Sequence, residues 1–286
     1  MLKENLLEKV SRVVSELCLE SNYGIRKDVF EALQRAEEKE EERLPKLVLG
    51  KLIENIKIAE AEKVPVCQDT GVAEVFVEVG KGVSIQGDLL EEAISRGVRD
   101  GYEQGYLRKS MVDDPLFLRR NTQDNTPALI HFQFGSSFRN RIKITLFPKG
   151  FGSENVGKVA MLAPDEGRRG VKRFILKVVK EAGANPCPPV IVGVGIGGTM
   201  QTCVFLAKKA LLRPLEARNP TASYALLEEE LLREINQLKI GVQGLGGLTT
   251  CLGVNIEHFP THMAGLPVGV NISCYALREA TRVLNA

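Results

Sequence analysis

The chain has 286 residues, of which 44% are hydrophobic and 26% charged, and its formal net charge is +2. This length can bury a large core, and the composition excludes a disordered or fibrous protein. A charge so close to zero argues against a dedicated nucleic-acid surface. Charged residues interrupt the N-terminal segment, and no later stretch reaches about 18 uninterrupted apolar residues, so we expect neither a signal peptide nor a membrane span.

The first sixty residues are predicted to be helical. Apolar residues recur at three- and four-residue spacing from Leu2 to Leu17, which indicates one buried helix face. Two further helical segments cover residues 25–43 and 46–63, and the first of these ends in a run of charges that suits a solvated face. We read no chemistry in these helices.

From Val64 onward the pattern changes to strands and helices joined by polar, glycine-bearing loops. Loops that carry functional residues on a rigid scaffold often have this composition. The expected strands cover residues 72–80, 128–135 and 141–150, the apolar run after Cys187 that opens into the glycines, and two runs around "PTHMAGLP". The expected helices cover residues 88–108, 168–184, 200–212 and 222–239. We therefore expect one domain of mixed α/β (α+β) class over residues 1–286, in which residues 1–63 are helical and residues 64–286 carry the strands and the polar loops.

A glycine run offers one reading of the function. Gly193, Gly195 and Gly198 satisfy the G-x-G-x-x-G pattern of a dinucleotide site, with apolar residues before them and a helix after them. Glu216 stands near the position of the acid that would bind the ribose. That acid should end a second parallel strand, yet the segment "LLRPLEARNP" has two prolines and no strand pattern. A dinucleotide-binding oxidoreductase is therefore a remote alternative.

The six cysteines offer another reading. We expect a cytoplasmic protein, and in a reducing compartment cysteines rarely form structural disulfides. None forms a C-x-x-C pair, so compact zinc, ferredoxin and thioredoxin motifs are absent. Cys67, Cys187 and Cys274 lie in loops, and the first two have neighbouring prolines that restrict the backbone and can orient a thiolate. The other cysteines lie on helical or strand-like stripes and are read as core residues: Cys18, Cys203 and Cys251.

Six ordered motifs give the chain a resemblance that covers nearly its whole length. They are "CQDTG", "NTQDNTPA", "KGFGSEN", "NPCPPVIVGVGIGGT", "QGLGGLTT" and "PTHMAGLPVGVNISC". Together they resemble the class I, iron–sulfur-dependent fumarase and tartrate dehydratase family. The match is to the N-terminal half, which in two-subunit members is a separate alpha subunit.

The resemblance implies a [4Fe–4S] cluster bound by Cys67, Cys187 and Cys274. Three thiolates on four irons leave one iron without a protein ligand, and an open metal position can act as a Lewis acid toward a substrate hydroxyl. The prolines around Cys187 would hold the ligand, and the glycines after it would let the backbone pack close to the cluster.

The resemblance also implies the residues that contact the substrate. Gln68 and Asp69 follow the first ligand, and Asp69 is the candidate for proton transfer at the adjacent carbon. His262 matches the family's substrate-contacting histidine and is the second catalytic candidate. Arg108 aligns with an arginine that holds a substrate carboxylate, for which a bidentate fork is suited.

A glycine-containing loop completes the implied substrate site. Its family-matched residues are Gly150, Ser153, Glu154 and Asn155. Phe151 replaces a glycine found in many single-chain members, so the details of this loop differ. We read "NTQDNTPA" as support whose Asn and Asp side chains bond backbone amides. The two other histidines, His131 and His258, lie on strand-like runs and are read as structural.

The implied function is reversible hydration of fumarate to (S)-malate, a reaction of the tricarboxylic acid cycle. The alternative is L-tartrate dehydration to oxaloacetate, since both reactions use C4 dicarboxylates. A cluster-carrying electron-transfer subunit is a further class, but it would need a fourth ligand. Only Arg108 is a credible arginine for two carboxylates, and the sequence ends at Ala286 after a helix expected at Cys274. We therefore expect a beta subunit to complete the site, alpha–alpha pairing and a dimer of heterodimers, with neither nucleic acid nor membrane as partner.

Overall fold

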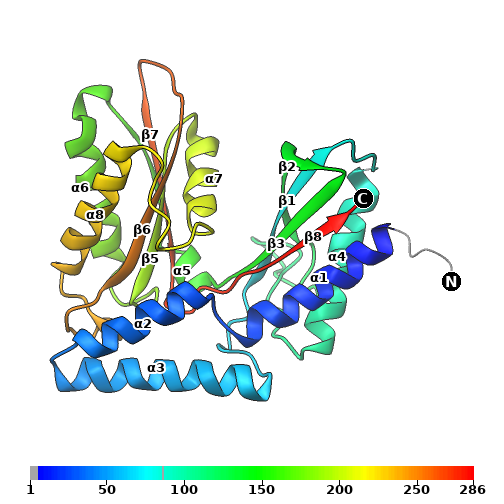
Figure 1. The fold of residues 1–286 in the computed structure, drawn as a ribbon, viewed down its shortest axis with the longest axis horizontal. Helices are drawn as coiled ribbons and strands as arrows, with labels where there is room; N and C mark the ends of the chain where they lie inside the picture. Colours follow the sequence, from blue (N-terminus) through cyan, green and yellow to red (C-terminus); the bar gives the residue numbers. More distant parts are fainter. Residues whose placement is uncertain (1–5, 86) are drawn as a thin grey trace. The chain divides into compact units, whose positions relative to one another are not determined.

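The structure, a computed structural model, describes residues 6–85 and 87–286 and divides into two compact units. The first unit comprises the residues through Ile25 together with 56–151 and 278–286, and the second comprises 26–55 and 152–277. Each contains a mixed sheet with helices, which confirms the predicted α+β class (Figure 1). Leu2, at the start of the expected apolar stripe, lies outside the described residues.

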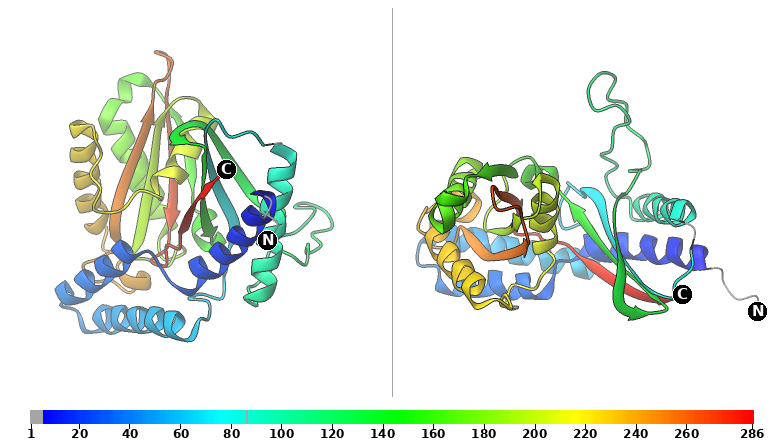
Figure 2. Two further views of the ribbon diagram at one scale, coloured as in Figure 1. Left: turned by 45° about the vertical axis from the view of Figure 1, so that its right-hand side comes forward. Right: turned by 90° about the horizontal axis from the view of Figure 1, so that it is seen from above.

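The first unit is built on a sheet of strand order β2-β1-β3-β8. Its elements are α1 (Leu6–Tyr23), β1 (Val72–Lys81), α4 (Gly87–Gln104), β2 (Leu129–Arg139), β3 (Arg141–Lys149) and β8 (Ala280–Asn285). Strands β1 and β2 are parallel, and the other two pairs are antiparallel. The connection from α4 to β2 extends outward as a long loop (Figure 2).

Alternate residues of β1 are buried apolar side chains, and they place the core of this unit on one face of its sheet. Residues from Ala73 to Val79, taken in steps of two, are buried in a single cluster with apolar residues of α1 and α4. The two helices approach closely because Gly97 has no side chain: a Cβ there would lie 2.4 Å from the carbonyl oxygen of Ser11. The opposite face of β1 carries Glu74, Phe76 and Glu78, of which the first two are also buried.

The second unit is built on a sheet of strand order β4-β7-β5-β6. Its elements are α2 (Lys27–Lys39), α3 (Arg43–Glu62, the end of which belongs to the first unit), α5 (Phe151–Glu154), β4 (Lys158–Leu162), α6 (Gly167–Ala182), β5 (Val190–Gly197), α7 (Met200–Ala210), α8 (Ala222–Asn236), β6 (Cys251–Phe259) and β7 (Leu266–Ser273). Two short 3-10 turns occur at Pro164–Glu166 and Val242–Gly244. Strands β5 and β6 are parallel, and β7 is antiparallel to both β5 and β4.

Helices cover both faces of this sheet. Helices α6 and α8 share a buried apolar cluster with β5, β6 and β7, and α7 lies on the other side (Figure 1). All eight residues of β5 are buried, as expected for a central strand with helices on both faces. The loops that carry Cys187 and Gln243 each run from a helix, α6 or α8, into a strand of this sheet.

Three local expectations differ from the structure. Strands β4 and β8 were not predicted, because five- and six-residue segments gain their pairing from β7 and β3 rather than from a strong pattern of their own. The loop expected at "KGFGSEN" contains the one-turn helix α5. The helix expected at Cys274 is absent, since Cys274 lies in the non-helical connection between β7 and β8.

Candidate functional site

The "CQDTG" loop is anchored to the first unit by a buried tyrosine. Cys67, Gln68 and Asp69 lie between α3 and β1, and the Cys67 thiol is 3.5 Å from the side-chain oxygen of Gln68. The Tyr102 hydroxyl, from α4, lies 2.8 Å from the carbonyl oxygen of Thr70 and 3.1 Å from that of Gly71. Burial raises the pKa of Tyr102, so its hydroxyl stays neutral and keeps a proton to donate.

Asp69 joins this loop to the end of β3. Its Oδ1 accepts a hydrogen bond from the Gly71 amide at 3.0 Å, and its Oδ2 accepts one from the Phe151 amide at 2.9 Å. Gly150 lies next to this carboxylate: a Cβ added to Gly150 would be 3.1 Å from Asp69 Oδ2. Asp69 and Gly150, two of the predicted site residues, are thus brought into contact within one unit.

The loop that carries Arg108 is tied to the same place. The Arg108 carbonyl accepts a hydrogen bond from Thr70 Oγ1 at 2.9 Å. Asn125, fully buried and with a positive φ of 61°, donates from Nδ2 to the Gly71 carbonyl and accepts at Oδ1 from the Ser110 amide. The Arg108 side chain is exposed, and no described residue bonds or pairs with its guanidinium. The backbone of this arginine is therefore fixed while its charged head stays available.

The "NTQDNTPA" segment has the supporting contacts that its composition predicted. Besides Asn125, the side-chain oxygen of Asn121 accepts from the Gln123 amide at 2.7 Å, and Asp124 Oδ1 accepts from the Thr126 amide at 3.0 Å. These are Asx-type bonds that fix the course of an exposed loop.

In the second unit, three of the quoted motifs meet at Cys187. Cys187 is exposed and takes a left-handed φ of 53°, a conformation that is costly for a residue with a Cβ and is common at functional turns. Gln243 of "QGLGGLTT" binds the Pro188 carbonyl through both its backbone amide (2.7 Å) and its side chain (2.8 Å). The amide of Tyr275, the residue after Cys274, donates to the Cys187 carbonyl at 3.5 Å. Cys187 and Cys274 are thereby brought together, and Gln243 is a supporting residue that sequence reasoning missed.

The glycines after Cys187 have a different role from the one we expected. Gly193 and Gly195 lie inside β5 and face α7: added Cβ atoms would lie 2.1 Å from the Ala207 carbonyl oxygen and 2.0 Å from that of Cys203. They admit the helix backbone against the strand, a contact for which a cluster is not required. The dinucleotide alternative also loses support, since residues 211–221, which are all described and include Glu216, contain no strand.

The "KGFGSEN" residues of the second unit are held by ordinary contacts. Glu154 Oε1 pairs with Lys208 Nζ at 3.0 Å, and its Oε2 accepts from Asn271 Nδ2 at 3.1 Å. Ser153 is buried and Asn155 is exposed. The Glu154 carboxylate is thus engaged by a cation and an amide of its own unit.

His262 is exposed in the turn between β6 and β7. Its Nδ1 accepts a hydrogen bond from the Ala264 amide at 3.1 Å. The preceding Thr261 donates to the Gly198 carbonyl at 2.8 Å and so ties this turn to the end of β5.

The other histidines lie on strands, as we expected. His131 Nε2 is 2.6 Å from the buried carboxylate of Glu74, and the His258 ring stacks on Tyr224.

Burial divides the six free cysteines into two sets. Burial raises the pKa of Cys18, Cys203 and Cys251, the last to about 12, and a thiol that resists ionisation is a poor metal ligand. The remaining three are partly or fully exposed on loops: Cys67, Cys187 and Cys274.

This donor set fits an iron–sulfur group chemically, because thiolates are its usual ligands. Cys67 belongs to the first unit, and the other two thiols belong to the second. Over residues 6–85 and 87–286, no group of three or more His, Cys, Asp or Glu side chains that could hold a metal ion is formed.

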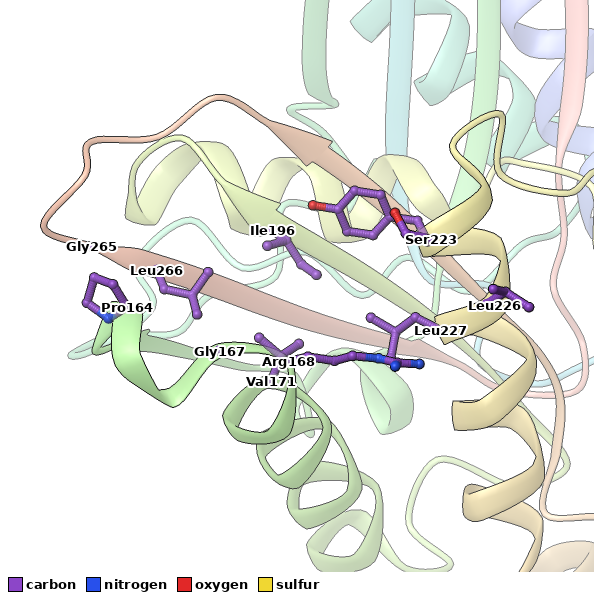
Figure 3. A pocket seen from close by; sticks show the side chains of 11 residues that line it. Pro164, Gly167, Arg168, Val171, Ile196, Ser223, Leu226, Leu227, Gly265 and Leu266 are labelled. Atoms are coloured by element: carbon purple, nitrogen blue, oxygen red, sulfur yellow. The ribbon is translucent and has the colours of Figure 1, made fainter.

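A pocket of about 440 Å³ in the second unit lies apart from the predicted residues. It is formed by the start of α6, the first turns of α8 and the strand β7, and its walls are mostly apolar (Figure 3). Arg168 enters it and pairs with Glu230 at 2.6 Å. None of the residues that we predicted to contact substrate or cluster lines this pocket.

Comparison with known proteins places the whole chain in one group. The family described as Fumarate hydratase (Fumerase) matches residues 11–283. A protein of Methanocaldococcus jannaschii, provisionally named L(+)-tartrate dehydratase subunit alpha, is 44% identical over 279 residues, covering 96% of this chain and 97% of that protein. Proteins of Escherichia coli K12 and Shigella boydii named L(+)-tartrate dehydratase subunit alpha are each 30% identical over 286 residues, covering 99% of this chain and 93% of theirs.

Within the described residues, no helix has both the length and the apolar character needed to cross a membrane. Because the family match spans nearly all residues, the chain belongs to the fumarate hydratase (Fumerase) family of hydro-lyases.

Proposed function

We propose that this chain is the alpha subunit of a two-subunit [4Fe–4S] hydro-lyase that interconverts fumarate and (S)-malate. The observation that carries the proposal is the family match over residues 11–283. The contacts that join "CQDTG" to Phe151 of "KGFGSEN" and to the backbone of Arg108 support it, because a hydro-lyase needs both a proton-transfer group and a cation for the substrate carboxylate.

Cys67, Cys187 and Cys274 would hold the cluster. When bound, the cluster supplies a Lewis-acidic iron that assists departure of the substrate hydroxyl. After anaerobic reconstitution, replacing any of these cysteines by Ser should abolish the cluster absorption and electron paramagnetic resonance signals. Cys18→Ala and Cys203→Ala, both in helices, should retain them. Loss of the signals only in Cys18→Ala and Cys203→Ala would overturn the ligand assignment. Substrate should also perturb the cluster signal of the unaltered complex, and an unchanged signal would favour an electron-transfer subunit.

Asp69 is our candidate for moving the proton at the neighbouring carbon, and His262 is the second. Gln68, Arg108 and the loop after Gly150 would orient the dicarboxylate. Asp69→Asn keeps the shape but can accept only one of the two amide hydrogen bonds, and it removes the proton-transfer group, so turnover should fall about 100-fold or more. The cluster spectrum serves as the control and should be unchanged. Near-normal turnover would reduce Asp69 to a residue that shapes the loop.

The remaining contributors to substrate binding are Ser153, Glu154 and Asn155. Of these, Glu154 is engaged by Lys208 and Asn271 in its own unit, so we assign it to fixing the loop rather than to proton transfer.

A beta subunit would complete the enzyme, in a dimer of heterodimers in which alpha subunits pair. The relatives named above are called subunit alpha, which supports this arrangement. The cluster-loaded alpha chain alone should show background turnover, and adding the beta subunit should restore full activity. Equal rates for the alpha chain and the complex would contradict a divided site. We place the enzyme in the cytoplasm, since all six cysteines are free thiols.

Tartrate dehydration is the second candidate, because the relatives named above carry that name. L-tartrate differs from malate by one added hydroxyl, and its dehydration gives oxaloacetate. Initial rates with fumarate, malate and L-tartrate should be measured side by side with one reconstituted complex. A higher kcat/KM for L-tartrate than for malate would replace our first assignment by the second.

A further inference from the structure

Two of the predicted cluster ligands lie at one end of the sheet of the second unit. Cys187 precedes β5 and Cys274 follows β7. In the register of these antiparallel strands, Ile191 pairs with Ser273, so the start of β5 lies beside the end of β7. The hydrogen bond from the Tyr275 amide to the Cys187 carbonyl joins the two loops. The thiols of this unit therefore belong to the same end of its sheet.

His262 lies at the other end of the same two strands. Its turn is joined to the end of β5 in two places: the Gly198 amide donates to the Pro260 carbonyl at 3.2 Å, and the Thr261 hydroxyl donates to the Gly198 carbonyl at 2.8 Å. This turn between β6 and β7 stands at the top of the sheet in Figure 1. Strand β7 has eight residues, so at about 3.3 Å per residue it separates His262 from Cys274 by about 25 Å.

The protein cannot shorten this distance by bending the strand. Strand β7 pairs with β4 and β5, and it is buried from Pro267 to Ser273. Thiolate–metal bonds of about 2.3 Å and hydrogen bonds of about 3 Å link a ligand thiol, its cluster and a bound substrate, so a residue that contacts the substrate must lie at the same end of the sheet as the thiols. His262 therefore cannot contact a substrate bound at Cys187 and Cys274 of its own chain.

The turn that carries His262 has the features of a contact with another chain. Its Nδ1 accepts from the Ala264 amide, so the neutral ring carries its proton on Nε2 and can donate it. Two apolar neighbours are well exposed, Phe259 at 57% and Met263 at 89%. The mostly apolar pocket of Figure 3 includes Gly265, at the end of the same turn. Exposed apolar side chains beside an apolar pocket are typical of a surface that another protein covers.

We propose that His262 contacts the substrate in the site of a second copy of this chain. The cysteines of each site would belong to one copy and the histidine to the other. The inference rests on the proposed function, which includes pairing of alpha subunits. A second copy is the partner because it carries the cysteine loops that His262 has to meet. In a pair with two-fold symmetry the exchange is reciprocal, so each of the two sites receives its histidine from the opposite chain.

A mixed complex that contains two different alpha variants tests the proposal. One alpha chain carries Cys187→Ser and one affinity tag, and the other carries His262→Asn and a second tag. Both are co-expressed with the beta subunit, and complexes that hold both tags are purified, reconstituted anaerobically and assayed with malate and L-tartrate. One site of each pair then has both changes and the other has neither. We expect about half the turnover of the unaltered complex, although each variant alone should show only background turnover.

Two matched variants serve as controls. The mixed complex of Cys187→Ser with Cys274→Ser should show no recovery, since both thiols serve the site of their own chain and every site then has one change. His258→Asn alters another exposed histidine of the second unit, whose ring stacks on Tyr224, and it should retain full turnover by itself.

Photo-crosslinking gives a readout that requires neither the cluster nor turnover. Met263, beside His262, is replaced by p-benzoylphenylalanine, and complexes are assembled from isotope-labelled and unlabelled alpha chains. Mass spectrometry should find the turn joined to peptides that contain Cys187 or Cys274, in products that combine a labelled and an unlabelled peptide.

Three results would overturn the proposal and leave the hydro-lyase assignment in place. Background turnover in the mixed complex would assign His262 to its own chain, and full turnover of His262→Asn alone would remove this residue from the reaction. Crosslinks confined to the beta subunit, or to peptides of the same label, would exclude the contact between copies. An unaltered complex that acts on neither malate nor L-tartrate would instead overturn the proposed function, and the crosslinks would still decide whether the turn meets the cysteine loops of a second copy.

Discussion

Asn125→Ala should loosen the connection between the Arg108 loop and the Asp69 loop. The substitution removes one hydrogen bond to the Gly71 carbonyl and one from the Ser110 amide. The Gly71 carbonyl keeps the Tyr102 hydroxyl at 3.1 Å, and the exposed Ser110 can reach water, so each loss should cost near the net value of about 1 kcal/mol. Placing Ala at a φ of 61° adds about 1 kcal/mol. We expect a total of about 3 kcal/mol.

Urea unfolding followed by circular dichroism measures this free energy, and hydrogen exchange of the Ser110 amide measures the local opening. Asn140→Ala is the matched control, because Asn140 also has a positive φ (50°) but lies exposed in the turn between β2 and β3. It should lose only about 1 kcal/mol. Asn125→Asp keeps the acceptor for Ser110 and should preserve protection of that amide. Equal losses of free energy in Asn125→Ala and Asn140→Ala would refute the reasoning.

Three further predictions concern packing, titration and thiol reactivity. Gly193→Ala would place a Cβ 2.1 Å from the Ala207 carbonyl oxygen, so α7 must shift and the free energy of unfolding should fall by about 1–3 kcal/mol in urea, whereas Gly24→Ala should change it little. Burial opposes ionisation of Asp124, but hydrogen bonds from Thr126 and Arg99 outweigh it and lower its pKa to about 2. The contribution of this carboxylate to stability should therefore be full above about pH 4 and be lost as the pH falls toward 2. The Asp124→Asn variant should lack this pH dependence of the unfolding free energy. Iodoacetamide followed by mass spectrometry should modify exposed Cys187 before Cys251, whose pKa burial raises to about 12, and the reverse order would contradict the assigned burial.

The fold class and most elements could be predicted from local pattern. The apolar stripe of α1 and the alternation of β1 are strong because each element buries one face, and burial selects for periodicity. Strands β4 and β8 could not be predicted, because what makes them strands is a partner far away in the sequence. The segment after Cys274 was expected to be helical, and only its place between two paired strands excludes this.

Some residues of the candidate site could likewise be predicted from the sequence, and others could not. Sequence alone determined the family, since six motifs in order carry it, and singled out Cys67, Cys187, Cys274 and Asp69 by type and context. Residues whose role depends on a distant contact gave no local signal.

Tertiary structure alone decided two assignments. Asn125 and Gln243 became supports because each bonds backbone atoms of another loop. Gly193 became a packing residue because α7 lies against it. Sequence records which side chains are present, but a hydrogen bond to a distant loop, or a helix packed against a glycine, exists only once the chain has folded.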